Sequence, residues 1–219
     1  MRDLLVTGTD TGVGKTVIAA SLVSALRARG VRALGFKPAE TGHNANDTTD
    51  SELLARASGE RVGLASPLLQ LSEPLAPAVA AERAGTVLNP EDVESRIAQL
   101  RKAGYTLVIE GAGGVMVPVT WDYTVLDLAE RCDLDAIVVA RAGLGTLNHV
   151  ALTVLMLQSR HIAVRGIVLN GRSDTPDLAE ATNPSTLARM LPGLRIVETP
   201  HQRGGDVIAA IAVIVDRLL

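Results

Sequence analysis

The sequence Gly8-Thr9-Asp10-Thr11-Gly12-Val13-Gly14-Lys15-Thr16 decides the fold of this chain. An apolar run at residues 4–6 precedes it, and apolar residues at helical spacing follow it: Val17, Ile18, Leu22, Val23 and Leu26. A strand, a glycine-rich loop and a helix in this order form the context of a phosphate-binding loop. Glycines let successive backbone N–H groups point at one anion, and the start of the helix adds the positive end of its dipole. We therefore predict that a nucleoside triphosphate binds here, with Lys15 at the outer phosphates and Thr16 on a magnesium ion.

The first glycine of this loop departs from the usual pattern, which is G-x-x-x-x-G-K-S/T. Gly8 comes one residue too early, and Thr9 stands where that glycine is expected. A glycine-rich turn that joins a strand to a helix without any ligand is the alternative interpretation. The Gly-Lys-Thr sequence, found between a strand and a helix, favours phosphate binding.

The composition of the 219 residues excludes several classes of protein: 47% are hydrophobic, 2% are aromatic, and the net charge is −3. Without linkers or repeats, we expect a single domain spanning residues 1–219 with an aliphatic core. The absence of a basic run predicts no nucleic-acid partner. Residues 4–6 are too short for a signal peptide and residues 207–215 too short to span a membrane, so we expect a cytoplasmic protein with no membrane partner. A single cysteine, Cys132, excludes an intramolecular disulfide.

Lysine is rare in this chain. Of the 21 basic residues only Lys15, Lys37 and Lys102 are lysines, and all the others are arginines. An ammonium is a compact point charge that fits against phosphate or carboxylate oxygens, whereas a guanidinium is broader and planar. Codon bias and chance are a sufficient explanation for Lys102. Lys37 follows a predicted strand and becomes a candidate for a site that requires an ammonium.

Strand-like and helix-like segments alternate along the sequence. We predict strands at residues 4–6, 31–36, 105–109, 136–140, 164–169 and 194–197, and residues 115–119 extend the third strand or form a short one. Helices are predicted after the loop, from Thr49 or Asp50 to Gly59, at 78–83, 89–104, 124–131, up to Arg160 and after Gly205, with a helical region at 176–191 that Asn183-Pro184 interrupts. The remainder of residues 60–88 gives no clear pattern. This alternation predicts an α/β fold, a mostly parallel sheet with helices on both faces.

Glycines, acids and amides follow the predicted strands. They lie at residues 8–16, 37–42, 110–114, 143–149, 170 and 200–202. The carboxyl ends of parallel strands share one edge of the sheet, and ligands of open α/β folds bind there. We therefore predict the site at this edge.

Two carboxylates are candidates for magnesium, which prefers oxygen ligands. Glu110 ends the buried strand at residues 105–109, although it could instead cap the next turn. Asp50 is a further candidate, but it could instead be the N-cap of the helix that begins there. Asp47 competes with Asp50 for the metal role.

Four motifs together resemble the dethiobiotin synthetase family, which has the P-loop NTPase fold. They are Gly-Thr-Asp-Thr-Gly-Val-Gly-Lys-Thr at residues 8–16, Lys-Pro-Ala-Glu-Thr-Gly at 37–42, Val-Ile-Glu-Gly-Ala-Gly-Gly at 108–114 and Leu-Gly-Thr-Leu-Asn-His at 144–149. The resemblance covers residues 3–202, and the early Gly8 is a mark of this family.

The resemblance implies an ATP-dependent ligase of biotin biosynthesis. The amine of 7,8-diaminopelargonic acid takes up CO2 to form a carbamate, ATP phosphorylates the carbamate, and the second amine closes the ring to dethiobiotin. The resemblance assigns Lys37 and Lys15 to catalysis, and Thr16, Asp50 and Glu110 to Mg2+; it also selects Asp50 over Asp47. It assigns to ATP the residues Thr11, Gly12, Val13, Gly14, Lys15, Thr16, Val17, Asp50, Glu110, Gly111, Ala112, Gly113, Asn170, Pro200, His201 and Gln202.

The resemblance also implies a homodimer with the substrate site at the interface. Thr41 would hydrogen-bond the substrate within its own subunit. The substrate carboxylate would be bound by a helix start of the neighbouring subunit, formed by Leu144, Gly145, Thr146, Leu147 and Asn148.

Two other functions remain open. An ATP-driven dimer switch of the partition type shares the fold, but such proteins carry a lysine where this chain has Asp10. Another P-loop ligase that activates a carboxylate is the second alternative, and the motif at residues 37–42 does not exclude it.

Overall fold

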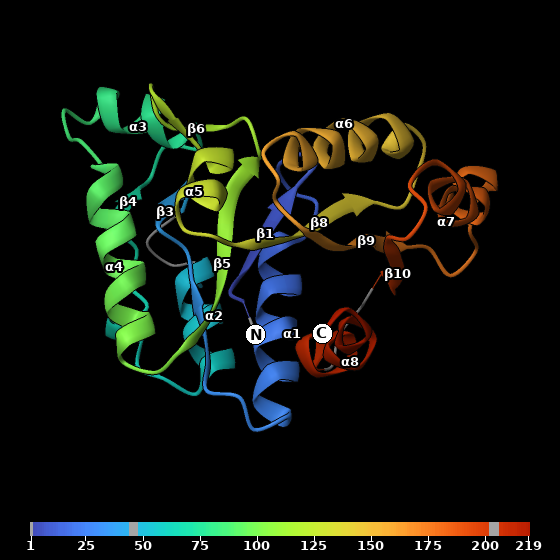
Figure 1. The fold of residues 1–219 in the computed structure, drawn as a ribbon, viewed down its shortest axis with the longest axis horizontal. Helices are drawn as coiled ribbons and strands as arrows, with labels where there is room; N and C mark the ends of the chain where they lie inside the picture. The colour runs from blue at the N-terminus through green and yellow to red at the C-terminus, as the bar shows by residue number, and fades with distance from the viewer. Residues whose placement is uncertain (1, 44–47, 202–205) are drawn as a thin grey trace.

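The structure, a computed structural model, describes residues 2–43, 48–201 and 206–219. The predictions for Asp47 and Gln202 concern residues outside these ranges. A six-stranded sheet with the order β10-β9-β8-β1-β5-β2 runs through the molecule, and every strand pair in it is parallel (Figure 1). The strands are β1 (Leu4–Gly8), β2 (Ala33–Phe36), β5 (Thr106–Gly114), β8 (Asp135–Arg141), β9 (Val164–Arg172) and β10 (Arg195–Pro200).

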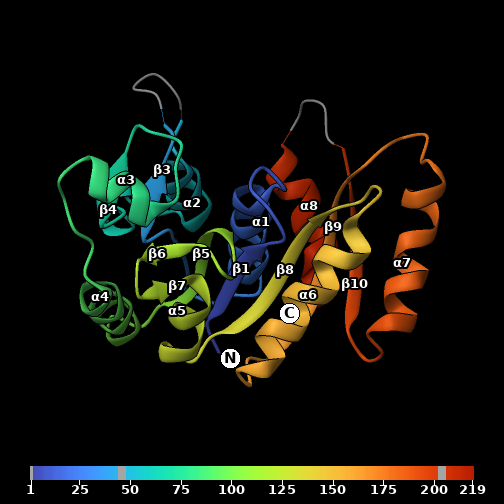
Figure 2. The same cartoon turned by 90° about the horizontal axis from the view of Figure 1, so that it is seen from above.

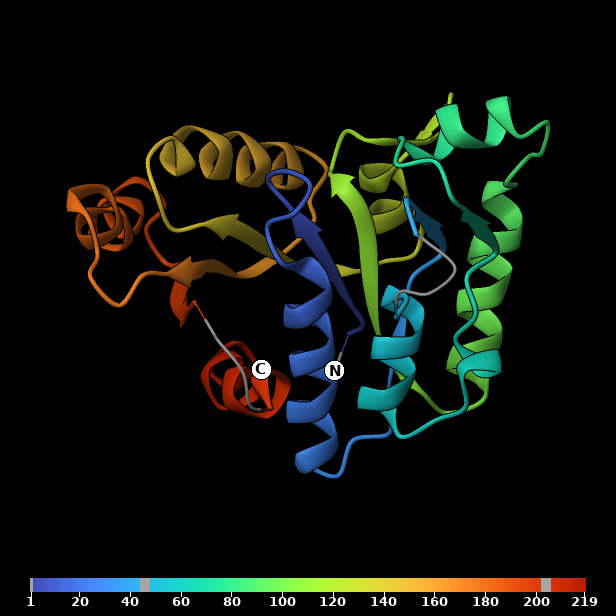
Figure 3. The same cartoon turned by 180° about the vertical axis from the view of Figure 1, so that it is seen from behind.

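Helices cover both faces of this sheet, because its strands are nearly continuous apolar runs that must be buried on both sides. One face carries α1 (Lys15–Ala28), α2 (Asp50–Ser58) and α8 (Val207–Val215), as Figure 3 shows. The other face carries α4 (Pro90–Lys102), α5 (Val125–Arg131), α6 (Thr146–Ser159) and α7 (Leu178–Met190) (Figure 2). The predicted α/β class, a parallel sheet between two helical layers, is confirmed.

Small elements lie beside the β2 edge of the sheet. They are the parallel pair β3 (Ala39–Thr41) and β4 (Leu69–Leu71), α3 (Pro77–Arg83), the hairpin of β6 (Pro118–Thr120) and β7 (Tyr123–Thr124), and the short 3-10 helix η1 (Val62–Leu64). A second 3-10 helix, η2 (Asp216–Leu218), follows α8. The predicted turn of helix at residues 78–83 is confirmed by α3, whereas the β3–β4 pair has no counterpart in the predictions. None of the described helices has the length and apolarity needed to cross a membrane.

The predicted break at Asn183-Pro184 is wrong, because α7 continues through both residues. Proline removes the backbone donor that would bond to the carbonyl of Glu180, four residues earlier, so other contacts must hold the helix here. Ser185 and Thr186 both donate to the backbone oxygen of Thr182. The side chain of Asn183 is buried and donates to the backbone oxygens of Ala142 and Gly143 at 2.7 and 3.0 Å, which fixes this part of the helix against the end of β8.

The predicted end of the third strand at Glu110 is also wrong. The strand β5 continues to Gly114 and pairs with β1 from Leu4 to Gly8, with a shift of register after Val6. The glycines after Glu110 let neighbouring elements approach this part of the strand closely. A Cβ on Gly111 would lie 2.7 Å from the Cγ1 of Val125. Glu110 is therefore held inside a strand and not in a loop.

Candidate active site

The loop between β1 and α1 has the backbone of a phosphate-binding loop. Gly12 and Gly14 have φ angles of +73° and +94°, which favour glycine. The early Gly8 also has a structural reason, because a Cβ there would lie 2.6 Å from the backbone oxygen of Asp10. The displaced glycine of the motif is thus required by the way the loop folds back on the end of β1.

Lys15 begins α1 and reaches back along this loop. Its Nζ donates to the backbone oxygen of Asp10 at 3.0 Å. Burial lowers the pKa of Lys15, and Lys37 adds to this effect, while Glu110 opposes it. The ammonium thus lies beside backbone N–H groups that can bind an anion, in a position suited to phosphate oxygens.

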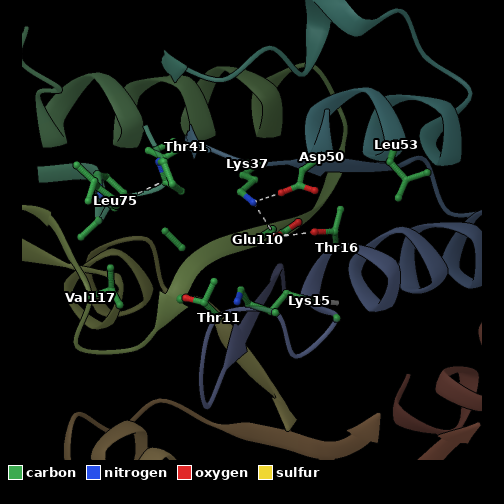
Figure 4. A pocket seen from close by; sticks show the side chains of 18 of the residues that line it. Thr11, Lys15, Thr16, Lys37, Thr41, Asp50, Leu53, Leu75, Glu110 and Val117 are labelled. Atoms are coloured by element: carbon green, nitrogen blue, oxygen red, sulfur yellow. Dashed lines mark hydrogen bonds and ion pairs between the residues drawn. The ribbon is translucent and has the colours of Figure 1, made fainter. Parts of the chain in front are cut away.

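The second cationic group, Lys37, lies between two carboxylates. Its Nζ forms an ion pair with Asp50 and donates to Glu110 Oε1 at 2.9 Å. The same oxygen of Glu110 accepts a hydrogen bond from Thr16 Oγ1 at 3.0 Å. Figure 4 shows the four side chains pointing toward one another, Lys37 from the end of β2 and the others from α2, β5 and α1. Lys37 and Glu110 are 73 residues apart in the sequence. Their side chains come into contact because β2 and β5 are neighbours in the sheet.

Charge and burial act against each other in this cluster. Burial alone lowers the pKa of Lys37, but the charges of Glu110 and Asp50 outweigh it and raise the pKa well above its ordinary value. Burial raises the pKa of the Glu110 carboxyl, and the ammonium of Lys37 is the main charge that opposes this rise. Lys37 is therefore protonated and compensates the negative charge of the buried Glu110.

Asp50 does not cap its helix. The N-cap of α2 is Thr49, whose hydroxyl accepts from the backbone N–H of Glu52 while the Glu52 carboxylate accepts from the backbone N–H of Thr49. The alternative interpretation of Asp50 as an N-cap is therefore wrong. Its carboxylate is free to turn toward Lys37.

The residues around Lys37 fit a magnesium ion. The donor set consists of two carboxylates and the Thr16 hydroxyl, and Glu110 Oε2 is buried without a hydrogen-bond partner. Mg2+ characteristically takes one or two carboxylates, keeps waters and completes its shell with phosphate oxygens. Among the described residues no group of three or more His, Cys, Asp or Glu could form a cage made by the protein alone.

A cavity of about 620 Å³ joins these groups. Its polar end is formed by predicted site residues, namely Thr11, Gly12, Gly14, Lys15, Thr16, Val17, Lys37, Asp50, Glu110, Ala112 and Gly113. Its other end is mostly apolar and includes Leu75, Ala76, Pro77 and Val117. Thr41 lines the cavity, and its hydroxyl donates to the backbone oxygen of Leu75 at 2.8 Å (Figure 4). The cavity can hold a phosphate group at one end and an aliphatic chain at the other.

The sequence comparisons agree on one family. A family model described as an AAA domain matches residues 2–203. The ATP-dependent dethiobiotin synthetase BioD of Anaeromyxobacter dehalogenans is 45% identical over 192 residues, which cover 87% of this chain and 86% of that protein. The chain belongs to the dethiobiotin synthetase family. The BioD proteins of Bacillus licheniformis, 41% identical with 86% and 81% of the two chains covered, and of Aquifex aeolicus, 38% identical with 90% and 88% covered, bear the same name.

Family membership makes the chain an ATP-dependent ligase of biotin biosynthesis. Among solved structures, an ATP complex of McdA from Cyanothece superposes with a TM-score of 0.55 at 14% identity, covering 90% of this chain and 82% of that one. At this identity the likeness shows the fold alone.

Several residues that the family resemblance assigns to ATP lie outside the lining of the cavity. Val13 and Gly111 are buried, Pro200 is the last residue of the edge strand β10, and His201 follows that strand. Asn170, at the end of β9, nevertheless contacts the phosphate-binding loop. Its Nδ2 donates to the backbone oxygen of Val13 at 2.9 Å, and its Oδ1 accepts from Thr199 Oγ1 at 2.6 Å.

The helix start that the dethiobiotin synthetase resemblance assigns to the substrate carboxylate is also separate from the cavity. Gly145 is the N-cap of α6 with a φ of +91°, and Leu144 is 93% exposed. Thr146 is buried, and its Oγ1 has no hydrogen-bond partner. Farther along α6, Leu152 and Leu155 are exposed, so this helix offers an apolar surface to solvent.

Three polar residues of this dethiobiotin synthetase fold were missed by the sequence analysis. Glu40 is buried beneath Asp50, Arg141 pairs with Asp10 of the phosphate-binding loop at 3.2 Å, and Asn183 holds the end of β8. Glu40 lies within the motif at residues 37–42, so the motif could have identified it as a candidate site residue. Arg141 is one of many arginines, and Asn183 precedes a proline that suggested a helix break.

Proposed function

We propose that this chain forms dethiobiotin from 7,8-diaminopelargonic acid, CO2 and ATP in three steps. One amine of the substrate adds to CO2 and loses a proton, giving a carbamate. A carbamate oxygen attacks the γ-phosphorus of ATP, giving a carbamic–phosphoric anhydride and ADP. The second amine attacks the carbonyl carbon, closes the ureido ring and releases phosphate.

The observation that carries this proposal is the cavity itself, which connects the phosphate-binding loop to an apolar wall. The carbamate and the γ-phosphate are both anions, so their reaction requires positive charge where they meet. Lys15 and Lys37 both line the cavity and supply two ammonium groups. We assign Lys15 to the phosphate oxygens and Lys37 to the oxygens shared between the carbamate and the γ-phosphate.

We assign Thr16, Asp50 and Glu110 to the magnesium ion, in agreement with the unpartnered oxygen of Glu110. When bound, Mg2+ would neutralise charge on the phosphates. The loop N–H groups from Thr11 to Val17 would bind the phosphates, and residues 110–113 would line the other side. On the adenine side we assign Asn170, Pro200, His201 and Gln202, and we assign Thr41 to the substrate amines.

The test is an assay of the purified protein with diaminopelargonate, bicarbonate, Mg2+ and ATP. We expect dethiobiotin and ADP in equal amounts, and no dethiobiotin when the diamine is left out. ATP hydrolysis that the diamine leaves unchanged, with no dethiobiotin formed, would refute the assignment. The same preparation with Lys15→Ala controls for contaminating enzymes and should be inactive.

We further propose a homodimer in which residues 144–148 of one subunit bind the substrate carboxylate of the other. The exposed Leu144 and the exposed leucines of α6 support this arrangement, since apolar surface of this kind is typical of subunit contacts. The start of α6 offers free N–H groups suited to a carboxylate.

Mixing two inactive variants tests the shared site. We expect Lys37→Met and Asn148→Asp each to be inactive alone. After subunit exchange, about a quarter of the wild-type activity should return, because half of the dimers are mixed and each mixed dimer has one intact site. Absence of any activity in a mixture shown to contain mixed dimers would contradict the shared site. Two Lys37→Met preparations mixed together provide the control.

A further inference from the structure

Glu40 is a buried carboxylate directly beneath the Lys37–Asp50 ion pair. It lies in β3 and is only 3% exposed. One of its oxygens, Oε1, accepts a hydrogen bond from the backbone N–H of Asp50. The other, Oε2, accepts from Ser51 Oγ at 2.9 Å, and Ser51 is itself buried. Both oxygens of Glu40 are thus used to hold the first turn of α2.

Capping of α2 does not by itself explain this arrangement. Thr49 and Glu52 already form a complete capping box at the same helix end. A buried carboxylate is costly unless it is well satisfied, and here the helix N-terminus supplies both donors and a favourable dipole. An additional buried charge at a helix that is already capped indicates a role besides helix stability.

The hydrogen bond between Glu40 and the backbone of Asp50 indicates what this role is. Glu40 belongs to the same short stretch as Lys37 and Thr41, and the hydrogen bond joins this stretch directly to Asp50. Lys37 forms an ion pair with the side chain of that same Asp50. The three residues therefore close a ring in which the backbone of Asp50 is fixed by Glu40 while its carboxylate faces Lys37.

We propose that Glu40 is a positioning residue that fixes Asp50 in the orientation needed to bind the metal ion. This inference rests on the proposed metal role of Asp50. Without Glu40, the Lys37–Asp50 ion pair is the polar contact that remains, among the described residues, between residues 37–41 and the first turn of α2. The Asp50 carboxylate then has more freedom, and the metal ion loses a ligand held in place beforehand.

The experiment measures binding and needs no turnover. The affinity for a non-hydrolysable ATP analogue is determined by calorimetry in Mg2+ and again in EDTA, and the ratio of the two affinities reports the metal contribution. We expect Glu40→Ala to lower this ratio about tenfold, the usual size for loss of a group that orients a metal ligand, while the affinity in EDTA is unchanged. Glu40→Gln should keep the ratio within about threefold of the wild type, because its amide oxygen can accept from the backbone N–H of Asp50 while its NH2 group donates to the Ser51 hydroxyl, which can accept.

Glu52→Ala is the matched control, because it removes a carboxylate from the same helix start without touching the Lys37 stretch. It should lower the thermal midpoint and leave the ratio unchanged. Equal ratios for Glu40→Ala and Glu52→Ala, or a ratio for Glu40→Gln as low as that for Glu40→Ala, would overturn the inference. A wild type that binds the analogue equally in Mg2+ and EDTA would overturn the metal role of Asp50 together with this inference, and dethiobiotin formation in the assay would still stand.

Discussion

Replacing Lys37 with arginine should lower the rate of dethiobiotin formation at least about 100-fold, the size of effect typical for loss of one charge-stabilising donor. The ammonium of Lys37 is buried and reaches both Asp50 and Glu110. A guanidinium is broader and planar, so it does not fit between the same two carboxylates and cannot present a single point charge to the phosphate. Nucleotide affinity should stay within a few-fold, because the phosphate-binding loop and Lys15 are unchanged.

Lys102→Arg is the control for this prediction, since it makes the same chemical change on the exposed surface of α4. It should have wild-type activity. Steady-state rates and calorimetric nucleotide binding for both variants decide the matter. A fully active Lys37→Arg enzyme would contradict the interpretation that the few lysines of this chain mark a need for an ammonium.

The Gly14→Ala variant should lose nucleotide binding by about 100-fold or more and unfold at a lower temperature. The backbone of Gly14 has a φ of +94°, and the left-handed region costs an ordinary residue about 1–2 kcal/mol. In addition, the new Cβ would lie 2.1 Å from Asn170 Nδ2, which is held in place by Val13 and Thr199. The loop must therefore move away from the position that binds phosphate.

Gly12→Ala separates the two causes, because Gly12 also has a positive φ but a Cβ there meets no atom within 4 Å. This variant should have the backbone strain of a positive φ without a steric clash, and should therefore bind nucleotide more tightly than Gly14→Ala. The double variant Gly14→Ala with Asn170→Ala removes the clash and should recover part of the lost thermal stability. If Gly12→Ala and Gly14→Ala behave alike in both measurements, the contact with Asn170 has no effect.

Local signals in the sequence were sufficient for most of the fold. Thr124 and Asn89-Pro90 mark helix starts by short-range chemistry, and α5 and α4 begin there. The pairing of β3 with β4 was not predicted, because it joins residues about 30 positions apart and neither strand has a pattern of its own. The proline in α7 suggested a break, because the contact of Asn183 with the end of β8, which holds this part of the helix, cannot be recognised from the sequence alone.

The sequence was sufficient to name the residues that line the cavity, but not the contacts between their side chains. The glycine loop, Lys37 and Glu110 each stand at or near the end of a predicted strand, and Asp50 stands at the start of a predicted helix. The fold brings all of them to one cavity. What the sequence could not reveal is that Lys37 contacts both carboxylates, or that Glu40 lies beneath Asp50. Such contacts depend on side-chain directions across different elements. The roles assigned to all of the site residues, the magnesium ion, the homodimer and the single domain stay predictions.

Lys37 already occupies the carboxylates to which we assign the metal ion. The carboxylates of Asp50 and Glu110 already have a resident counter-ion in its ammonium. Residues Asp50 and Glu110 would hold a divalent ion with the same oxygens that now face this ammonium, so the ion would compete with Lys37 and bring two positive charges where one is held. An ammonium released in this way would stay attached at the end of β2, in the lining of the cavity that also contains Lys15. Loading the metal and freeing the lysine for the phosphate would then be a single coupled event.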